Sequence, residues 1–375
     1  VNALQAISPG QTAKTVGKFT GIAGMITAAL ILSFYSIVAG WMLAFMLEPL
    51  ATLLGFESLG TWLTEFSLVR NIGFAACFVF LTVLIISAGV EQGIEKWSSR
   101  LMPSLFVLMI GLILYVLTQN GAAEGLRHYL VPDFSQITDP KLIVSAMGQA
   151  FFSMSLGVGT MLVYGSYIRA DENLPTVGAL VTLTDTSVAF LAGLLVLPAV
   201  FVAQNLGVTI YADSGALIAG PDLIFQVLPA LFDGMGSAGM FVGLAFFVLM
   251  SIAAVTSSIS MLEVPVSYAV EAHQVDRHKA TWLVGAAVLS ASILICLNFE
   301  SLFGFVITMT TERAQPLLSM VLCIFAGWVF YRNSILDELK SGNPDVEQGL
   351  FWKIWPVYVK FFCPALILLT FAQGL

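Results

Sequence analysis

Nine runs of mostly apolar residues, each long enough to cross a lipid bilayer, limit what this chain can fold into. They lie near residues 19–48, 71–90, 101–118, 141–168, 174–204, 236–270, 279–298, 301–331 and 352–374. A helix that crosses a bilayer needs about 20 such residues, and backbone groups in hydrocarbon must be hydrogen-bonded within the protein. Charged residues make up only 10% of the 375, against about 25% in soluble domains. We therefore predict an all-α integral membrane protein with about nine transmembrane helices.

The run at 141–168 contains a stretch that is expected to interrupt its helix within the membrane. Its middle reads GQAFFSMSLGVG at 148–159, where two serines are followed by two further glycines. Non-helical backbone survives at that depth only where protein or a water-filled cavity covers it, and transporters use such breaks to bind ions or substrates. A close contact between two helices, which small residues permit, is the alternative interpretation.

Basic residues concentrate in alternate loops, which predicts the orientation of the chain in the membrane. With the N-terminal end in the cytoplasm, the cytoplasmic side holds Lys14, Lys18, Lys96, Arg100, Arg169, Arg277, Lys279, Arg332, Lys340 and Lys353. The opposite side holds Arg70, Arg127 and Lys141. We expect a multi-pass protein of the cell inner (plasma) membrane, with its C-terminus outside after an odd number of crossings.

Charge and residue spacing exclude several classes of function. The formal net charge is −8 without a basic patch, so nucleic acid is not an expected partner. The three histidines lie in loops or at the ends of runs, and none has a Ser/Asp or Cys partner at a recognisable spacing. Because no nucleophile–base constellation is present, the chain is predicted not to be an enzyme.

Polar residues inside the runs mark candidate ion sites. Ala253, Thr256 and Ser257 have the i, i+3, i+4 spacing that places a backbone carbonyl and two hydroxyls on one helix face. Such neutral oxygens suit a hard cation, although Thr and Ser hydroxyls also bond back to their own helix. Asp185 lies well inside its run, where a carboxylate is costly unless it is paired or coordinates an ion. Tyr35 lies in the middle of its run, away from the interfacial belts where tyrosines usually lie. Its hydroxyl could form a structural hydrogen bond or contact a ligand, and the sequence leaves both interpretations open.

Several stretches together resemble the neurotransmitter:sodium symporter family in its bacterial amino-acid branch. The residues at 148–159 resemble the family's discontinuous sixth helix, and Tyr164-x-Ser166-Tyr167-x-Arg169 resembles the cytoplasmic end of that helix. Three other motifs resemble the turn between helices four and five, the external loop before helix six, and helix eight: Gly93-Ile94-Glu95-Lys96 with Met102-Pro103, Pro132-Asp133-Phe134, and Thr256-Ser257-Ser258 followed by Glu263.

The resemblance covers nearly the whole chain and implies the inverted-repeat sodium symporter fold, with a discontinuous helix, in a single domain at 1–375. The remainder of the first repeat is expected at about 17–120, the second repeat at about 141–331, and an extra C-terminal helix at about 352–374. The family has eleven or twelve helices, and this chain begins in what resembles the loop before helix three. We therefore expect the chain to lack the family's first two helices, with two apolar runs encoded upstream of Val1.

The resemblance also implies a function, which is sodium-coupled symport of an amino acid, expected to be hydrophobic, by alternating access. Two sodium sites are implied: Ser153 and Asp185 would serve the first, and the Ala253 carbonyl, Thr256 and Ser257 the second. Chloride is not expected, because Asp185 offers a fixed negative charge beside the first cation. The expected partners are the amino-acid substrate and the lipid bilayer. The sequence predicts no oligomeric state.

Carried over from the family, the substrate pocket would be lined by Ile31, Tyr35, Phe152, Ser153, Ser155, Val158, Ser257 and Met261. Phe152 would close over the substrate as a gate, and Glu271 would belong to the cytoplasmic gate. Ile307 stands where the family usually has an acidic external-gate residue, and Glu312 and Arg313 follow it. These departures leave open two alternatives: a transporter-like receptor or regulator that binds a ligand without moving it, and an inactive truncated transporter.

Overall fold

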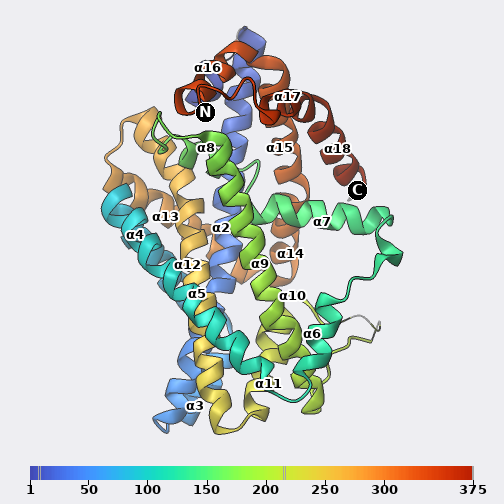
Figure 1. The fold of residues 1–375 in the computed structure, drawn as a ribbon. Coiled ribbons are helices and arrows are strands. Elements are labelled where there is room, and N and C mark those ends of the chain that lie inside the picture. Colours follow the sequence, from blue (N-terminus) through green and yellow to red (C-terminus); the bar gives the residue numbers. More distant parts are fainter. Residues whose placement is uncertain (7, 9, 214, 216, 374–375) are drawn as a thin grey trace.

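The computed structural model describes residues 1–373 except 7, 9, 214 and 216, and this part of the chain is almost entirely helical (Figure 1). The long helices are α2 (Gln11–Leu53), α4 (Leu68–Ser87), α5 (Lys96–Leu117), α9 (Leu174–Asn205), α12 (Ser237–His273) and α13 (Arg277–Leu297). The all-α prediction is confirmed.

Shorter helices connect or extend these. They are α1 (Asn2–Ala6), α3 (Glu57–Thr64), α6 (Ala122–Leu130), α7 (Pro140–Ser153), α8 (Thr160–Gly165), α10 (Gly220–Asp222), α11 (Leu228–Gly234), α14 (Phe299–Ile307), α15 (Gln315–Ile324), α16 (Arg332–Gly342), α17 (Leu350–Val357) and α18 (Cys363–Gln373). Five segments have π-helical geometry, η1 (Val90–Glu95), η3 (Leu223–Val227), η4 (Thr308–Ala314), η5 (Phe325–Val329) and η6 (Tyr358–Phe362), and η2 (Phe134–Gln136) is a 3₁₀ turn.

Seven continuous helical stretches among the described residues are long and apolar enough to cross a membrane, and an eighth is bent. The bent stretch joins Phe299–Val329 to Arg332–Gly342 at an angle of 97°. The run at 141–168 does not add a continuous ninth span, because it folds into the two short helices α7 and α8. The described residues therefore form seven continuous spans and one bent span instead of the predicted nine, because one helix is bent and the run at 141–168 is broken. Position 374, at the end of the last predicted run, lies outside the described residues.

The core is built around α2 and α12, which pack along one another and against α4 and α13. Ile37 of α2 and Ile259 and Leu262 of α12 are fully buried. Buried hydroxyls tie the same helices together: those of Thr82 and Ser258 lie 2.9 Å apart, and Ser292 Oγ donates to the Ser33 carbonyl at 2.7 Å. Interhelical hydrogen bonds of this kind fix helix positions where apolar side chains alone discriminate poorly.

The loops at 119–140 and 205–235 carry α6 and the α10–α11 segment. Helix α6 packs closely on α9, because Gly125 lies where a side chain would meet the backbone of Leu197 and Pro198. Tyr129 Oη donates to the Phe190 carbonyl at 3.2 Å.

The break predicted in the run at 141–168 lies at residues 154–159, between α7 and α8. Figure 1 shows α7 running across the long helices, whereas α8 lies near one end of them. The backbone of the break enters the left-handed region at Ser155 (φ 49°), Gly157 (φ 86°) and Gly159 (φ 88°). Glycine adopts that region without the steric cost a side chain brings, so the glycines predicted to weaken the helix do interrupt it.

Gly157 also lies in close contact with α15. A Cβ atom there would lie 2.5 Å from the Gln315 carbonyl oxygen and 2.5 Å from Ser319 Oγ, both on α15. Covering by α15 explains how the unwound backbone of the break is accommodated.

Gly157→Ala should destabilise the protein. A left-handed backbone costs a non-glycine residue about 1–2 kcal/mol, and overpacking against α15 adds about 1–3 kcal/mol. The midpoint of thermal unfolding of the detergent-solubilised protein measures the effect. Gly111→Ala is the matched control, because Gly111 is helical, exposed and has open space where the methyl group would go. Equal midpoints for the two variants would contradict the close contact at Gly157.

Candidate functional site

The two residues predicted for the first sodium site lie in direct contact. Ser153 is the last residue of α7, and its Oγ donates to Asp185 Oδ1 of α9 at 2.7 Å. Asp185 is half-buried, and Ser153 is exposed. The break therefore brings a hydroxyl and an intramembrane carboxylate together, and hard oxygen donors of this kind suit an alkali cation.

The residues predicted for the second sodium site all lie on one turn of α12. Thr256 Oγ1 donates to the Ala253 carbonyl at 2.9 Å and lies 3.3 Å from that of Ile252. The hydroxyl thus bonds back to its own helix, as the alternative interpretation anticipated. The same bond holds the Thr256 oxygen next to the Ala253 carbonyl, so both predicted ligands are close together. Ser257 is exposed beside them.

Four predicted pocket residues lie on the paired helices α2 and α12. Ile31 and Met261 are buried, and the side chain of Tyr35 interacts with that of Ser257. Tyr35 also packs edge-on against Phe78, with ring centroids 6.5 Å apart. The structure therefore brings a predicted substrate residue of α2 next to a residue predicted for both the substrate and the second sodium site.

The other predicted pocket residues lie at the end of α7 or in the break, and they differ in burial. Val158 is 2% exposed, and the backbone at 157–158 packs near Gly24 of α2. Phe152 is 38% exposed, so its ring does not close over a pocket in this conformation. Ser155 takes its left-handed conformation within the break.

Gln315, which sequence reasoning missed, joins α15 to the broken helix. Its Nε2 donates to the Phe151 carbonyl at 2.8 Å, and the side chain is 1% exposed. A glutamine between a charged segment and Pro316 gives no periodic signal, so the sequence alone offers little to identify it. Only the packing of α15 on α7 assigns it to the site.

A second network that sequence reasoning did not assemble lies beyond the break. Glu263 of α12 is completely buried; it accepts a hydrogen bond from Tyr167 Oη at 2.5 Å and pairs with Arg277 Nη2 at 2.6 Å. Arg277 Nε also donates to the Ile86 carbonyl at 3.3 Å. An intramembrane carboxylate was the available signal, because such a group must find a partner.

Glu271, predicted for the gate, is exposed. It lines a cavity of about 140 Å³ together with Ser166, Ser267 and Tyr268. It lies about two turns along α12 from Glu263, so this part of α12 carries both acidic residues.

The departures noted after Ile307 fall on the π-helical segment η4. Glu312 is exposed, and Arg313 Nη1 lies 4.0 Å from Met309 Sδ. Within the described part of the chain, neither residue forms an ion pair.

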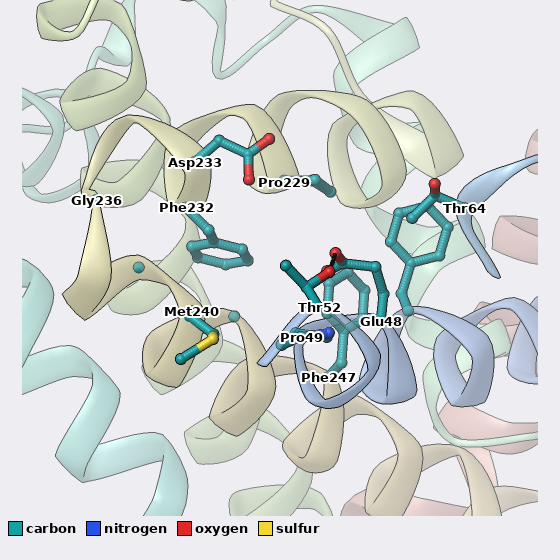
Figure 2. Close-up of a pocket in the computed structure, with 13 residues that line it drawn as sticks. Glu48, Pro49, Thr52, Thr64, Pro229, Phe232, Asp233, Gly236, Met240 and Phe247 are labelled. Carbon is teal, nitrogen blue, oxygen red and sulfur yellow. Dashed lines mark hydrogen bonds between the residues drawn. The ribbon is translucent and has the colours of Figure 1, made fainter. Parts of the chain in front are cut away.

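A separate hollow of about 480 Å³ lies at the opposite end of the core from the Glu263 network. Figure 2 shows Phe232 and Asp233 of α11 across from Glu48 and Thr52 of α2. Thr52 Oγ1 donates to Glu48 Oε1 at 2.8 Å. The lining contains no residue that the sequence predicted for sodium, substrate or gate, so this hollow is not the predicted site.

Known proteins resemble the chain in both sequence and fold. It is 31% identical over 367 residues to an uncharacterized sodium-dependent transporter, YhdH, of Bacillus subtilis, a match that covers 94% of this chain and 78% of that protein. It is 26% identical over 304 residues to the sodium-dependent serotonin transporter of Drosophila melanogaster, over 76% of this chain and 46% of that protein.

The crystal structure of MhsT in complex with L-phenylalanine has a similar fold, with a TM-score of 0.80 and 34% sequence identity over 96% of this chain and 81% of that chain. This match confirms the predicted sodium symporter fold. The model of the sodium:neurotransmitter symporter family matches residues 58–375. The chain therefore belongs to the sodium:neurotransmitter symporter family, whose members are sodium-dependent membrane transporters and not enzymes.

Proposed function

We propose that this protein couples the inward movement of sodium to the uptake of a hydrophobic amino acid by alternating access. The contact between Ser153 and Asp185 supports the proposal, because it brings a hydroxyl and a carboxylate together at the end of α7, directly before the helix breaks. The likeness to MhsT in complex with L-phenylalanine supports an amino acid as the substrate class.

Ser153 and Asp185 contribute to one sodium site in this proposal, and the Ala253 carbonyl, Thr256 and Ser257 contribute to another. Chloride is not required, since Asp185 supplies the negative charge that balances the cation. Sodium bound at the first site holds α7 to α9, and sodium at the second stabilises α12 against the substrate-binding face of α2.

In this proposal the two repeats, at about 17–120 and about 141–331, move relative to one another during transport. The interactions of Glu263 with Tyr167 and Arg277 join the turn after α8 to α12 and α13, so they support a gate that opens when these segments separate. The orientation proposed from the basic residues places this gate on the cytoplasmic side of the plasma membrane.

Uptake of radiolabelled L-phenylalanine into proteoliposomes is the deciding experiment. An inward sodium gradient should drive accumulation, and potassium in place of sodium should abolish it. A receptor-like protein would bind the amino acid and show no accumulation above the external concentration, which would contradict symport.

Asp185→Asn should weaken sodium binding. One charge pair about 4 Å apart is worth about 4 kcal/mol at an effective dielectric constant near 20, so the sodium half-saturation of uptake should rise at least about tenfold. Asp213→Asn, in an exposed loop, is the control and should leave it unchanged. An unaltered sodium titration in Asp185→Asn would remove this carboxylate from the site.

Val158→Phe should alter the choice among substrates by size. Overpacking typically costs about 1–3 kcal/mol, and we expect affinity for phenylalanine to fall more than affinity for alanine. The ratio of the two half-saturation values is the readout, because a loss of folded protein lowers both uptake rates and leaves that ratio intact. An unchanged ratio would place Val158 outside the pocket.

A further inference from the structure

The Phe151 carbonyl lies in the last turn of α7 before the break. It accepts the Leu156 N–H at 3.0 Å, which closes the turn that contains Ser153 and Ser155. It also accepts the Gln315 Nε2 at 2.8 Å. A carbonyl oxygen has two lone pairs, so one serves the turn itself and the other is held from α15.

Helix α15 touches the break a second time, beyond that turn. The Gln315 carbonyl oxygen and Ser319 lie where a Gly157 side chain would be, and Ser319 Oγ donates to the same Gln315 carbonyl at 2.9 Å. The start of α15 therefore contacts the chain on both sides of Ser153 and Ser155. A shift of α15 relative to α7 would move the turn that presents the Ser153 hydroxyl.

Only one of the two polar atoms of the Gln315 side chain, Nε2, has a hydrogen-bond partner among the described residues. Its Oε1 is buried and has no hydrogen-bond partner among the described residues. A buried unpaired acceptor costs about 1–3 kcal/mol, so an apolar residue would suit this position better if packing were its whole purpose. The donor on Nε2 is what a leucine could not supply.

The π-helical segment η4 ends immediately before Gln315. Single π turns inside helices occur frequently at functional sites. Here the π segment sets the position at which α15 begins, directly beside the broken helix.

We propose that Gln315 is a positioning residue for the first sodium site. By holding the Phe151 carbonyl, it fixes the turn after α7 so that Ser153 Oγ faces Asp185. Gln315 itself does not touch the ion. This inference rests on the proposed sodium site, and it adds a residue from α15 to the groups that determine sodium affinity.

The substitution Gln315→Leu removes the donor and keeps a side chain of comparable volume. The half-saturating sodium concentration should rise about three- to tenfold, as for the loss of one hydrogen bond. The readout is the increase in the thermal unfolding midpoint of the purified protein with sodium concentration, which requires no transport. Variants that merely fold less well would start from a lower midpoint and keep the wild-type half-saturation.

Gln315→Glu makes the test specific to the donor. A carboxyl group can donate to the Phe151 carbonyl only when it is protonated. Position 315 is buried, and burial raises the pKa of a carboxyl group above its ordinary value, so sodium affinity in this variant should match wild type at about pH 5.5 and depart from it towards about pH 9. Gln315→Leu should stay weakened throughout. Gln204→Glu, at an exposed position of α9, is the control for the added charge.

Other titratable groups on the elements that pack against α15 set the baseline for this comparison. They include Tyr35 on α2, Lys141 on α7, Glu312 and Arg313 on η4, Lys360 on η6 and Cys363 on α18. The wild-type protein carries all of them, so its own pH profile is subtracted from that of each variant.

The outcomes separate the inference from the proposed function. If sodium does not raise the unfolding midpoint of the wild-type protein, the sodium site itself is wrong. If sodium does so and Gln315→Leu has the wild-type half-saturation, the site stands and Gln315 does not position it. Weakened binding in Gln315→Glu at low pH, equal to that of Gln315→Leu, would also overturn the role of the donor.

Discussion

The structure depends on one constraint, which is that backbone polar groups at membrane depth need partners inside the protein. Residues 154–159 leave the helix, yet the Phe151 carbonyl is bonded twice and the glycine backbone lies directly on α15. Because α15 covers the break and donates a hydrogen bond to the Phe151 carbonyl before it, the non-helical backbone is tolerated in a chain otherwise built of continuous helices. It also leaves Ser153 and Asp185 in contact at the end of α7.

The rest of the molecule divides into a firm core and a looser region around the break. Buried hydroxyls and apolar side chains join α2, α4, α12 and α13. By contrast, α7 has no buried residue among those described, and the first half of α9 is largely exposed. Packing of this kind holds α7 and the first half of α9 less firmly than the helices of the core.

Buried charge follows the same division. Glu263 is paired with Arg277 and accepts from Tyr167, all at the end of the core near α8. Breaking a buried pair is strongly unfavourable unless water reaches the separated charges. Separating this network is therefore costly unless water reaches its charged groups.

The sequence by itself determined the class of protein, because apolar runs of bilayer length permit only helices. It also located the break, since Gly157 and Gly159 allow backbone conformations that other residues resist. Asp185 was recognisable because a carboxylate inside an apolar run demands a partner. The number of continuous spans was less certain, because a bend of 97° and a break do not appear in a hydropathy pattern.

Only the tertiary structure decided which distant residues meet. Hydropathy and helical spacing describe neighbours within one helix, whereas the contacts of Ser153 with Asp185 and of Tyr167 with Glu263 join different helices. Gln315 shows the limit most clearly: nothing in its local sequence distinguishes it from a surface glutamine, and its contact with Phe151 spans 164 positions. Such a partnership arises from the packing of α15 on α7, which no local pattern encodes.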